Sequence, residues 1–578
     1  VTIVFLYENK TKYLKIYFTL RFYFTILRMP VHAGLAVGWI LFGVISALTL
    51  VFSFLYIRYY QHKYDKELSS TVTSILALSI CLVTSALGPV DIFLVSYMKY
   101  SNGTFKEWAN ITEERKSIED TVLYAYYALY ICVMVFVFLF LPLVYFFYEE
   151  KDDDVQVSTK QRCCTAMKYT AGFLFMATIL LVVGAFAPVK IPPNTNQTEW
   201  RKIEYMFKEF ASNNGEDALS FVISCLTLIG LLLLIIYTAY GMSAWPIDLL
   251  KGTQSASSER MRVIDERTTN RTKIEAIRNK YSNGRPMRQR DRIKIAELEE
   301  TDRLMSRQEA QLESRELSCL SKCSILLRPV EILAGIVFFL IALVVFVSLL
   351  LTNIDKVMHS LGWRMGYALP KRTLPNPVDI MLVYAQMIFP LDYIIMSGII
   401  LYFFFCSVMG IRKIGIWFCW LRMFKIRPRK TRPQGLLFMC MMLMFMVLAI
   451  NILTYMVMPQ YTTYGGQHYL QPENRTAIDP ATNHTYIKIV LTTQPCNTHA
   501  NTQLNTDVCI MTRMSFLLTR FFYKVWFFGA AYFFASWGFL GMCLIGFIVA
   551  LIRRRKSAID GEVDEDDFDS VDDELIRA

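Results

Sequence analysis

Apolar residues gather in nine long runs along this chain, and polar loops separate the runs. A helix needs roughly 20 apolar residues to cross the hydrocarbon core of a bilayer, and every run reaches about that length. The pattern therefore predicts an all-α polytopic membrane protein with about nine transmembrane helices. The predicted spans cover residues 34–57, 71–95, 123–148, 169–189, 218–240, 330–351, 379–408, 434–458 and 527–551.

The composition supports a lipid-facing protein. Hydrophobic residues make up 54% of the chain and aromatic residues 14%, which is too apolar for a soluble protein with a wetted surface. The formal net charge is +11. Lys and Arg cluster just beyond the spans, where retention of positive charge in the cytosol and anionic lipid account for them. We therefore expect the lipid bilayer, and no nucleic acid, as a partner.

Two signals orient the bundle in the same way. The segments after spans one, three, five, seven and nine are rich in Lys and Arg. All but one of the Asn-x-Ser/Thr sequons after the first span lie instead in loops that follow even-numbered spans. Glycans are added in the secretory lumen and positive charge stays in the cytosol. We therefore predict a luminal N-terminus and a cytosolic C-terminus. The predicted glycosylation sites are Asn102, Asn110, Asn196, Asn474 and Asn483.

The remaining sequon, at Asn270, lies in residues 241–329, a charged cytosolic insert between spans five and six. We expect this asparagine to stay unmodified. Asn283-Gly284 and Pro286 divide the insert into two charged stretches, and such residues interrupt helices. We predict a helical hairpin, with a solvated, mobile linker as the alternative.

The predicted domains follow from these boundaries. Residues 1–28 are aromatic and basic and are interpreted as an upstream extension outside the fold. Residues 29–240 hold spans one to five, and residues 330–551 hold spans six to nine. The acidic tail, residues 552–578, is expected to be disordered and cytosolic.

The largest luminal loop is predicted at residues 459–526. It contains Cys496 and Cys509, which are close enough in sequence to form a disulfide in an oxidising compartment. The histidines of this loop match no zinc-binding spacing, so no metal site is predicted.

No catalytic motif is present in the sequence, and we predict that the protein is not an enzyme. It also lacks a phosphate-binding loop with lysine, so the energy for any transport must come from a gradient or a partner.

Asp392 follows Pro390 inside a long apolar run. A broken helix beside a buried carboxylate is typical of transporter sites. The alternative is a kink at which Asp392 caps the second half of the helix.

Further polar residues are candidates for a substrate pathway. Asp91 lies in Pro89-Val-Asp-Ile, and the same four residues recur from Pro377. Both copies are expected at the luminal face on oppositely running helices. An inverted repeat would produce this arrangement, but we favour a chance recurrence of residues that are common at helix ends. Gln386 and Asn451 complete the candidate set.

Several longer segments, in order, resemble the limb-region-type family of membrane proteins. They span residues 89–98, 102–108, 145–154, 238–244, 389–393 and 415–418. The resemblance runs from about Met29 to the C-terminus. It implies a nine-span lysosomal membrane protein that is required to move cobalamin from the lumen to the cytosol, with cobalamin as cargo and no catalytic cofactor.

The resemblance also implies a partner. Members act with an ATP-binding-cassette transporter of the lysosomal membrane, so the chain is expected to be either the transporter of cobalamin or an escort of that partner. Other members are lipocalin receptors, so the alternative is a receptor or endocytic adaptor, with a pool at the plasma membrane. A monomer and a homodimer are both compatible with the sequence.

The lysosomal sorting signal departs from the family pattern. Where the family has Tyr-x-x-Leu, this chain has Ser258-Glu-Arg-Met261, without tyrosine. The acidic tail contains Asp572, Leu575 and Ile576, which loosely resemble an acidic dileucine signal. These three residues are the sorting candidate.

Overall fold

The structure is a computed structural model that describes most of residues 33–553, and residue 555. The exceptions are residues 63–66, 151–158, 187–215, 282–286, 318, 361, 363–366, 368, 370–371, 389, 419–420, 479–484, 497–508, 525 and 554. Several predictions fall outside the described residues: the extension at 1–28, glycosylation at Asn196 and Asn483, and the sorting candidate Asp572, Leu575 and Ile576.

The described residues contain nine helices that are long and apolar enough to cross a membrane, which confirms the predicted number. Two of them contain a π-helical turn, η2 (Phe136–Phe140) and η3 (Leu234–Thr238). The spanning helices are α2 (Ala33–Tyr60), α3 (Leu68–Tyr97), α4 (Thr112–Val135) with η2 and α5 (Leu141–Glu149), α6 (Thr159–Phe186), α8 (Glu216–Leu233) with η3 and α9 (Ala239–Lys251), α12 (Cys319–His359), α14 (Leu391–Ile414), α15 (Pro433–Val457) and α18 (Trp526–Ile552).

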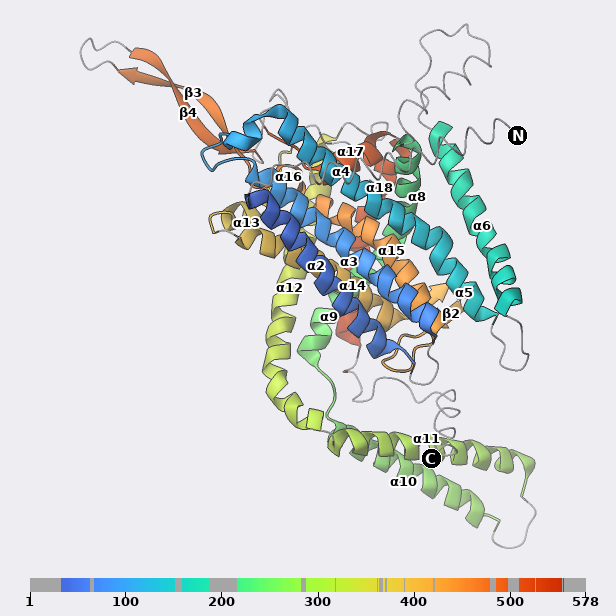
Figure 1. Ribbon diagram of the computed structural model, residues 1–578. Helices are drawn as coiled ribbons and strands as arrows, with labels where there is room; N and C mark the ends of the chain where they lie inside the picture. The colour runs from blue at the N-terminus through green and yellow to red at the C-terminus, as the bar shows by residue number, and fades with distance from the viewer. Residues whose placement is uncertain are drawn as a thin grey trace, which may run out of the picture. The chain divides into compact units, whose positions relative to one another are not determined.

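The chain divides into two compact units. The first comprises Val1–Gly241 and Leu343–Cys543, and the second comprises Met242–Ala342 and Leu544–Ala578. In the first unit, α15 is buried along most of its length and packs against α3 and α8. Figure 1 shows α3 and α15 within the bundle, with α2 beside α3. Helices α2 and α6 expose most of their apolar side chains, as helices that face lipid do.

Helix α14 crosses η3 and the start of α9 at very short range. A Cβ atom on Gly410 would clash with the carbonyl oxygen of Tyr237, and one on Gly241 would clash with that of Cys406. Beside these glycines, the buried hydroxyls of Thr238 and Ser407 share a hydrogen bond of 2.7 Å. Small residues and hydroxyl pairs are the usual means of helix association in lipid. The crossing therefore depends on the two glycines.

Short elements cluster at one end of the first unit. They are η1 (Glu107–Asn110), α13 (Pro377–Ala385), α16 (Pro459–Tyr464), β3 (His468–Ile478), β4 (Thr485–Pro495) and α17 (Arg513–Lys524). We call this end the α16 end. Strands β3 and β4 pair antiparallel with each other, and the ribbon extends away from the helices (Figure 1). A second pair, β1 (Ile416–Phe418) with β2 (Leu421–Phe424), follows α14. The sequence pattern predicted none of these strands.

Span seven starts later than predicted. The apolar run at 379–408 is interrupted, so that α13 ends at Ala385 and α14 begins at Leu391. Pro390 stands at the start of α14 and cannot donate a backbone hydrogen bond. The spanning helix is therefore Leu391–Ile414, and Asp392 lies in its first turn instead of near the middle of a span.

The second unit contains the charged insert, which forms a helical hairpin of α10 (Ala256–Asn279) and α11 (Gln289–Leu317). Few apolar side chains join the two helices, and ion pairs run between them. Arg267 pairs with Glu309 at 2.6 Å and with Asp302 at 3.3 Å, and all three side chains are about four-fifths buried. A connected, partly buried set of charges holds helices together better than isolated surface pairs do.

Asn270 is part of this helix contact. Its side chain is 6% exposed, and its Nδ2 donates a 2.8 Å hydrogen bond to the carbonyl oxygen of Leu298. Asn102, in contrast, is exposed in a turn and accepts hydrogen bonds from Thr104. A glycan can be attached to the exposed asparagine without disturbing the fold but not to the buried one.

We expect Asn102→Gln to increase the electrophoretic mobility of the full-length protein by the mass of one glycan, because it removes an accessible acceptor. Asn270→Gln should leave the mobility unchanged. Both variants are compared before and after enzymatic removal of N-glycans. A glycan on Asn270 would contradict both the hairpin contact and the predicted orientation.

Candidate functional site

The polar residues predicted to line a pathway lie mainly at the α16 end, but they do not converge on one space. Asp91 is in α3, Asp392 is in the first turn of α14, and Gln386 directly follows α13. Asn451 lies deeper, inside α15, and is 3% exposed. The carboxylate of Asp91 contacts α17 and that of Asp392 contacts α16, so the two residues do not share one site.

Asp379 holds the N-terminus of α16. Its carboxylate accepts hydrogen bonds from the backbone N–H groups of Tyr461, at 3.0 Å, and Gln460, at 3.4 Å. The first N–H groups of a helix have no partner within the helix, and a negative charge there is favourable. Arg372 approaches the same carboxylate at 3.6 Å. Asp379 thus acts as a cap supplied by another helix.

Asp91 does the same for α17. Its carboxylate, 1% exposed, accepts a 2.8 Å hydrogen bond from the backbone N–H of Met514 in the first turn of α17. The preceding residue, Arg513, forms an ion pair with Glu119 of α4. The two Pro-Val-Asp-Ile segments therefore carry the same function: each aspartate caps a short helix far away in the chain. This agrees with a role of the repeated segment at helix ends. Each aspartate, however, caps the start of a helix other than the one it belongs to.

Asp392 contacts α16 from a third side. The Tyr461 hydroxyl donates a 2.7 Å hydrogen bond to its carboxylate, and both side chains are buried. The backbone N–H of Tyr461 thus donates a hydrogen bond to Asp379, and its hydroxyl donates one to Asp392. Asp379 and Asp91 cap the two short helices, and Asp392 holds α16 through a side chain; we call these three residues the capping aspartates.

The short helices in turn hold the base of the β3–β4 ribbon. Gln467 lies between α16 and β3 and exchanges two hydrogen bonds with the backbone of Ile510, at 2.7 and 3.0 Å. A disulfide joins Cys496, after β4, to Cys509, before α17. Two independent links therefore fix the ribbon to the end of the bundle.

Lys99 adds a third link to the ribbon. Its Nζ donates a 3.2 Å hydrogen bond to the carbonyl oxygen of His468. Burial, reinforced by the positive charge of Arg115, lowers the pKa of Lys99 to about 8. The lysine remains charged below that pH, so this contact is complete in neutral and acidic solution.

The other pathway candidates have different surroundings. Pro390 lines an apolar cavity between α2, α3 and α14. Gln386 packs against the backbone at Gly466, and Asn451 lies beside Tyr130 in the interior of the bundle. Among the described residues, no three His, Cys, Asp or Glu side chains lie close enough to hold a metal ion.

The comparison with known proteins matches the whole length of this bundle. A family model described as LMBR1-like membrane protein matches residues 38–323. The chain is 47% identical to a protein of Nematostella vectensis named "Probable lysosomal cobalamin transporter", over 95% of this chain and 99% of that protein. The chain belongs to the LMBR1-like membrane protein family.

Vertebrate members of the family are similar to the same degree. The chicken protein named "Lysosomal cobalamin transport escort protein LMBD1" is 47% identical over 94% of this chain and 98% of its own length. The bovine protein of the same name is 46% identical over 94% of this chain and 97% of its own length. No solved structure matches the chain.

Sequence reasoning missed Asp379, Arg372 and Tyr461 as members of this site. The repeated Pro-Val-Asp-Ile segment was the available signal for Asp379, because it placed that residue in the same context as Asp91. No local signal marked Tyr461, whose partner Asp392 is 69 residues away.

Proposed function

We propose that this protein takes part in the export of cobalamin from the lysosome lumen to the cytosol, as an escort of an ATP-binding-cassette transporter. The observation that carries the proposal is identity of 45–47% over nearly the full length of proteins named for lysosomal cobalamin transport. The similarity covers 93–95% of this chain, which is far more than any one group of helices.

The surroundings of the polar residues favour an escort over a conduit. Cobalamin is large and polar, and a pathway for it would need polar side chains that are free to contact the cargo. Asp91, Asp379 and Asp392 instead form hydrogen bonds with α16 and α17. The absence of a phosphate-binding motif from the sequence also fits a partner that supplies the energy.

We propose that the α16 end faces the lumen. Asn102 and Asn110 lie at this end, and Asn474 is in β3, so three of the predicted glycosylation sites are on one side. The disulfide between Cys496 and Cys509 also suits an oxidising compartment. The described residues of β3 and β4 form a two-stranded sheet, and the outer edge of such a ribbon is able to pair with another protein in the lumen.

The export function is tested in cells that lack their own family member. Expression of this chain should restore the release of radiolabelled cobalamin from lysosomes, whereas an empty vector should leave it trapped. Failure of a correctly localised, glycosylated protein to restore release would overturn the proposal. A protein found mainly at the cell surface by biotinylation would favour the receptor function instead.

The escort function needs a second experiment. Three liposome samples are compared. The first contains only the purified full-length protein, the second contains this protein together with the lysosomal ATP-binding-cassette transporter, and the third contains only the transporter. An escort should produce no cobalamin flux alone. Flux through this chain by itself would show that it is the transporter.

A further inference from the structure

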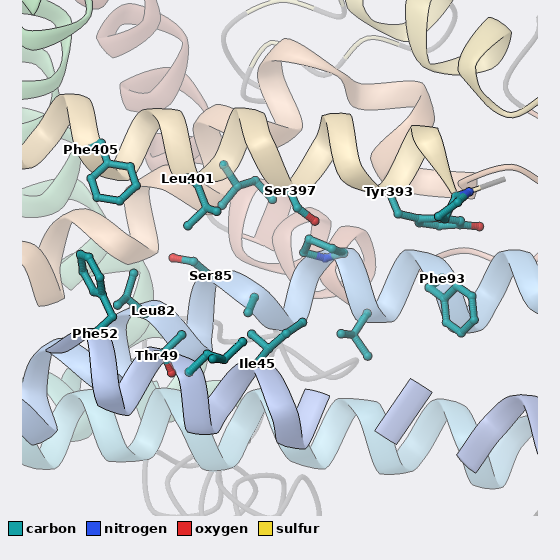
Figure 2. A pocket seen from close by; sticks show the side chains of 16 residues that line it. Ile45, Thr49, Phe52, Leu82, Ser85, Phe93, Tyr393, Ser397, Leu401 and Phe405 are labelled. Carbon is teal, nitrogen blue, oxygen red and sulfur yellow. The ribbon is translucent and has the colours of Figure 1, made fainter. Parts of the chain in front are cut away.

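An elongated apolar cavity lies between α2, α3 and α14 in the first unit. Its volume is about 570 Å³, within the range typical of small-molecule sites. Figure 2 shows side chains of all three helices directed into it. Helix α2 exposes apolar side chains such as Val51, 55% exposed, and Leu55, 61% exposed, so this side of the bundle faces hydrocarbon. A molecule that enters the cavity must therefore come from the lipid phase.

Aromatic pairs close both ends of the cavity. Phe52 meets Phe405 at one end, with ring centroids 6.0 Å apart, and Phe93 meets Tyr393 at the other, at 5.4 Å (Figure 2). Tyr393 and Phe405 are both in α14, and 12 residues of helix correspond to about 18 Å. The space between the pairs is long enough for a rigid, extended molecule and is bounded by flat ring faces.

One hydroxyl in the cavity is free to bind a ligand. Thr49 donates to the carbonyl of Ser46, Ser85 donates to that of Cys81, and Tyr393 bonds with Ser96. Ser397 also lines the cavity and forms no hydrogen bond with any residue that the structure describes. Its hydroxyl points from α14 into the space between the helices (Figure 2).

The opposite wall offers a second polar group. Pro89 of α3 lines the cavity and has no N–H group, so the carbonyl of Ser85 lacks its usual partner four residues later. A ligand hydroxyl could accept a hydrogen bond from Ser397 and donate one to this carbonyl. The hydroxyls of the other described lining residues, Thr49, Ser85 and Tyr393, each already have a hydrogen-bond partner.

We propose that this cavity binds a membrane sterol. A sterol is a rigid apolar body with a single hydroxyl, which matches a long apolar cavity whose free hydroxyl, Ser397, lies on α14 four residues from Tyr393 and eight from Phe405, nearer to the Phe93–Tyr393 pair. A phospholipid acyl chain would fill the apolar part but leave Ser397 and the Ser85 carbonyl unpaired, at a cost in free energy. None of the three capping aspartates is among the residues that line the cavity.

The proposal is tested by photolabelling of the purified full-length protein with a photoreactive cholesterol analogue in nanodiscs. We expect saturable labelling of peptides from α2, α3 or α14 that excess cholesterol removes and excess phosphatidylcholine does not. Labelling that does not saturate, or that phosphatidylcholine removes as well as cholesterol does, would overturn the proposal in favour of nonspecific contact or an acyl chain.

Two variants test the location. Ala86→Phe fills the cavity from α3 and should abolish saturable labelling, whereas Val51→Phe, which adds the same ring on the lipid-facing side of α2, should not change it. Ser397→Ala removes one oxygen, so the fold is kept, and should weaken sterol affinity about fivefold, as expected for the loss of one hydrogen bond. Unchanged affinity in Ser397→Ala, or unchanged labelling in Ala86→Phe, would overturn the proposal.

Discussion

Replacement of Gly410 by valine is expected to prevent most of the protein from folding. At this position α14 approaches the backbone of η3 so closely that a Cβ atom would overlap the carbonyl oxygen of Tyr237. A backbone atom cannot move aside as a flexible side chain can, so the two helices must separate. Separation would also break the 2.7 Å hydrogen bond between Thr238 and Ser407. We expect a loss of more than about 3 kcal/mol, at the upper end of the cost of overpacking.

The same helix provides a matched control. A Cβ atom on Gly398 of α14 would meet no atom within 4 Å, so Gly398→Val makes the same chemical change without the clash. The yield of monodisperse protein, measured by fluorescence-detected size-exclusion chromatography, should fall sharply for Gly410→Val and stay near wild type for Gly398→Val. Equal yields for the two variants would show that α14 and η3 do not cross at this distance.

The part of the fold that could be predicted from the sequence is the part set by local composition. Whether a segment spans a membrane depends on its own length and apolarity, and the number of spans is confirmed by the described residues. The start of span seven was predicted wrongly because residues 379–408 are mostly apolar, with only isolated polar residues and no polar loop among them. Hydrophobicity does not reveal the break before Leu391, and Pro390, its only local signal, is also compatible with a kink.

The capping contacts could not be predicted, because the partners are far apart in the chain. Asp91 and Met514 are separated by 423 residues, and Asp379 and Tyr461 by 82. A buried carboxylate in a span indicates that some partner is needed, but it does not identify that partner. The same sequence signal therefore fits a transport pathway and a helix cap, and only the tertiary contacts distinguish them.

Asp91→Ala is expected to destabilise the α16 end, because it leaves the buried N–H of Met514 without an acceptor and removes the negative charge at the start of α17. Loss of a charged, buried hydrogen-bond partner costs about 2–4 kcal/mol. Asp91→Asn keeps an acceptor oxygen and should cost less. Asp379→Ala should behave like Asp91→Ala, because Asp379 caps α16 in the same way.

The melting temperature of the purified protein in detergent separates a capping role from a pathway role. If Asp91 is a cap, the alanine variant should melt well below wild type, the asparagine variant should lie between them, and cobalamin export should fall only as far as the amount of folded protein falls. If Asp91 lined a pathway, Asp91→Asn would lose export at an unchanged melting temperature. That result would reject the capping interpretation and, with it, the structural argument for an escort.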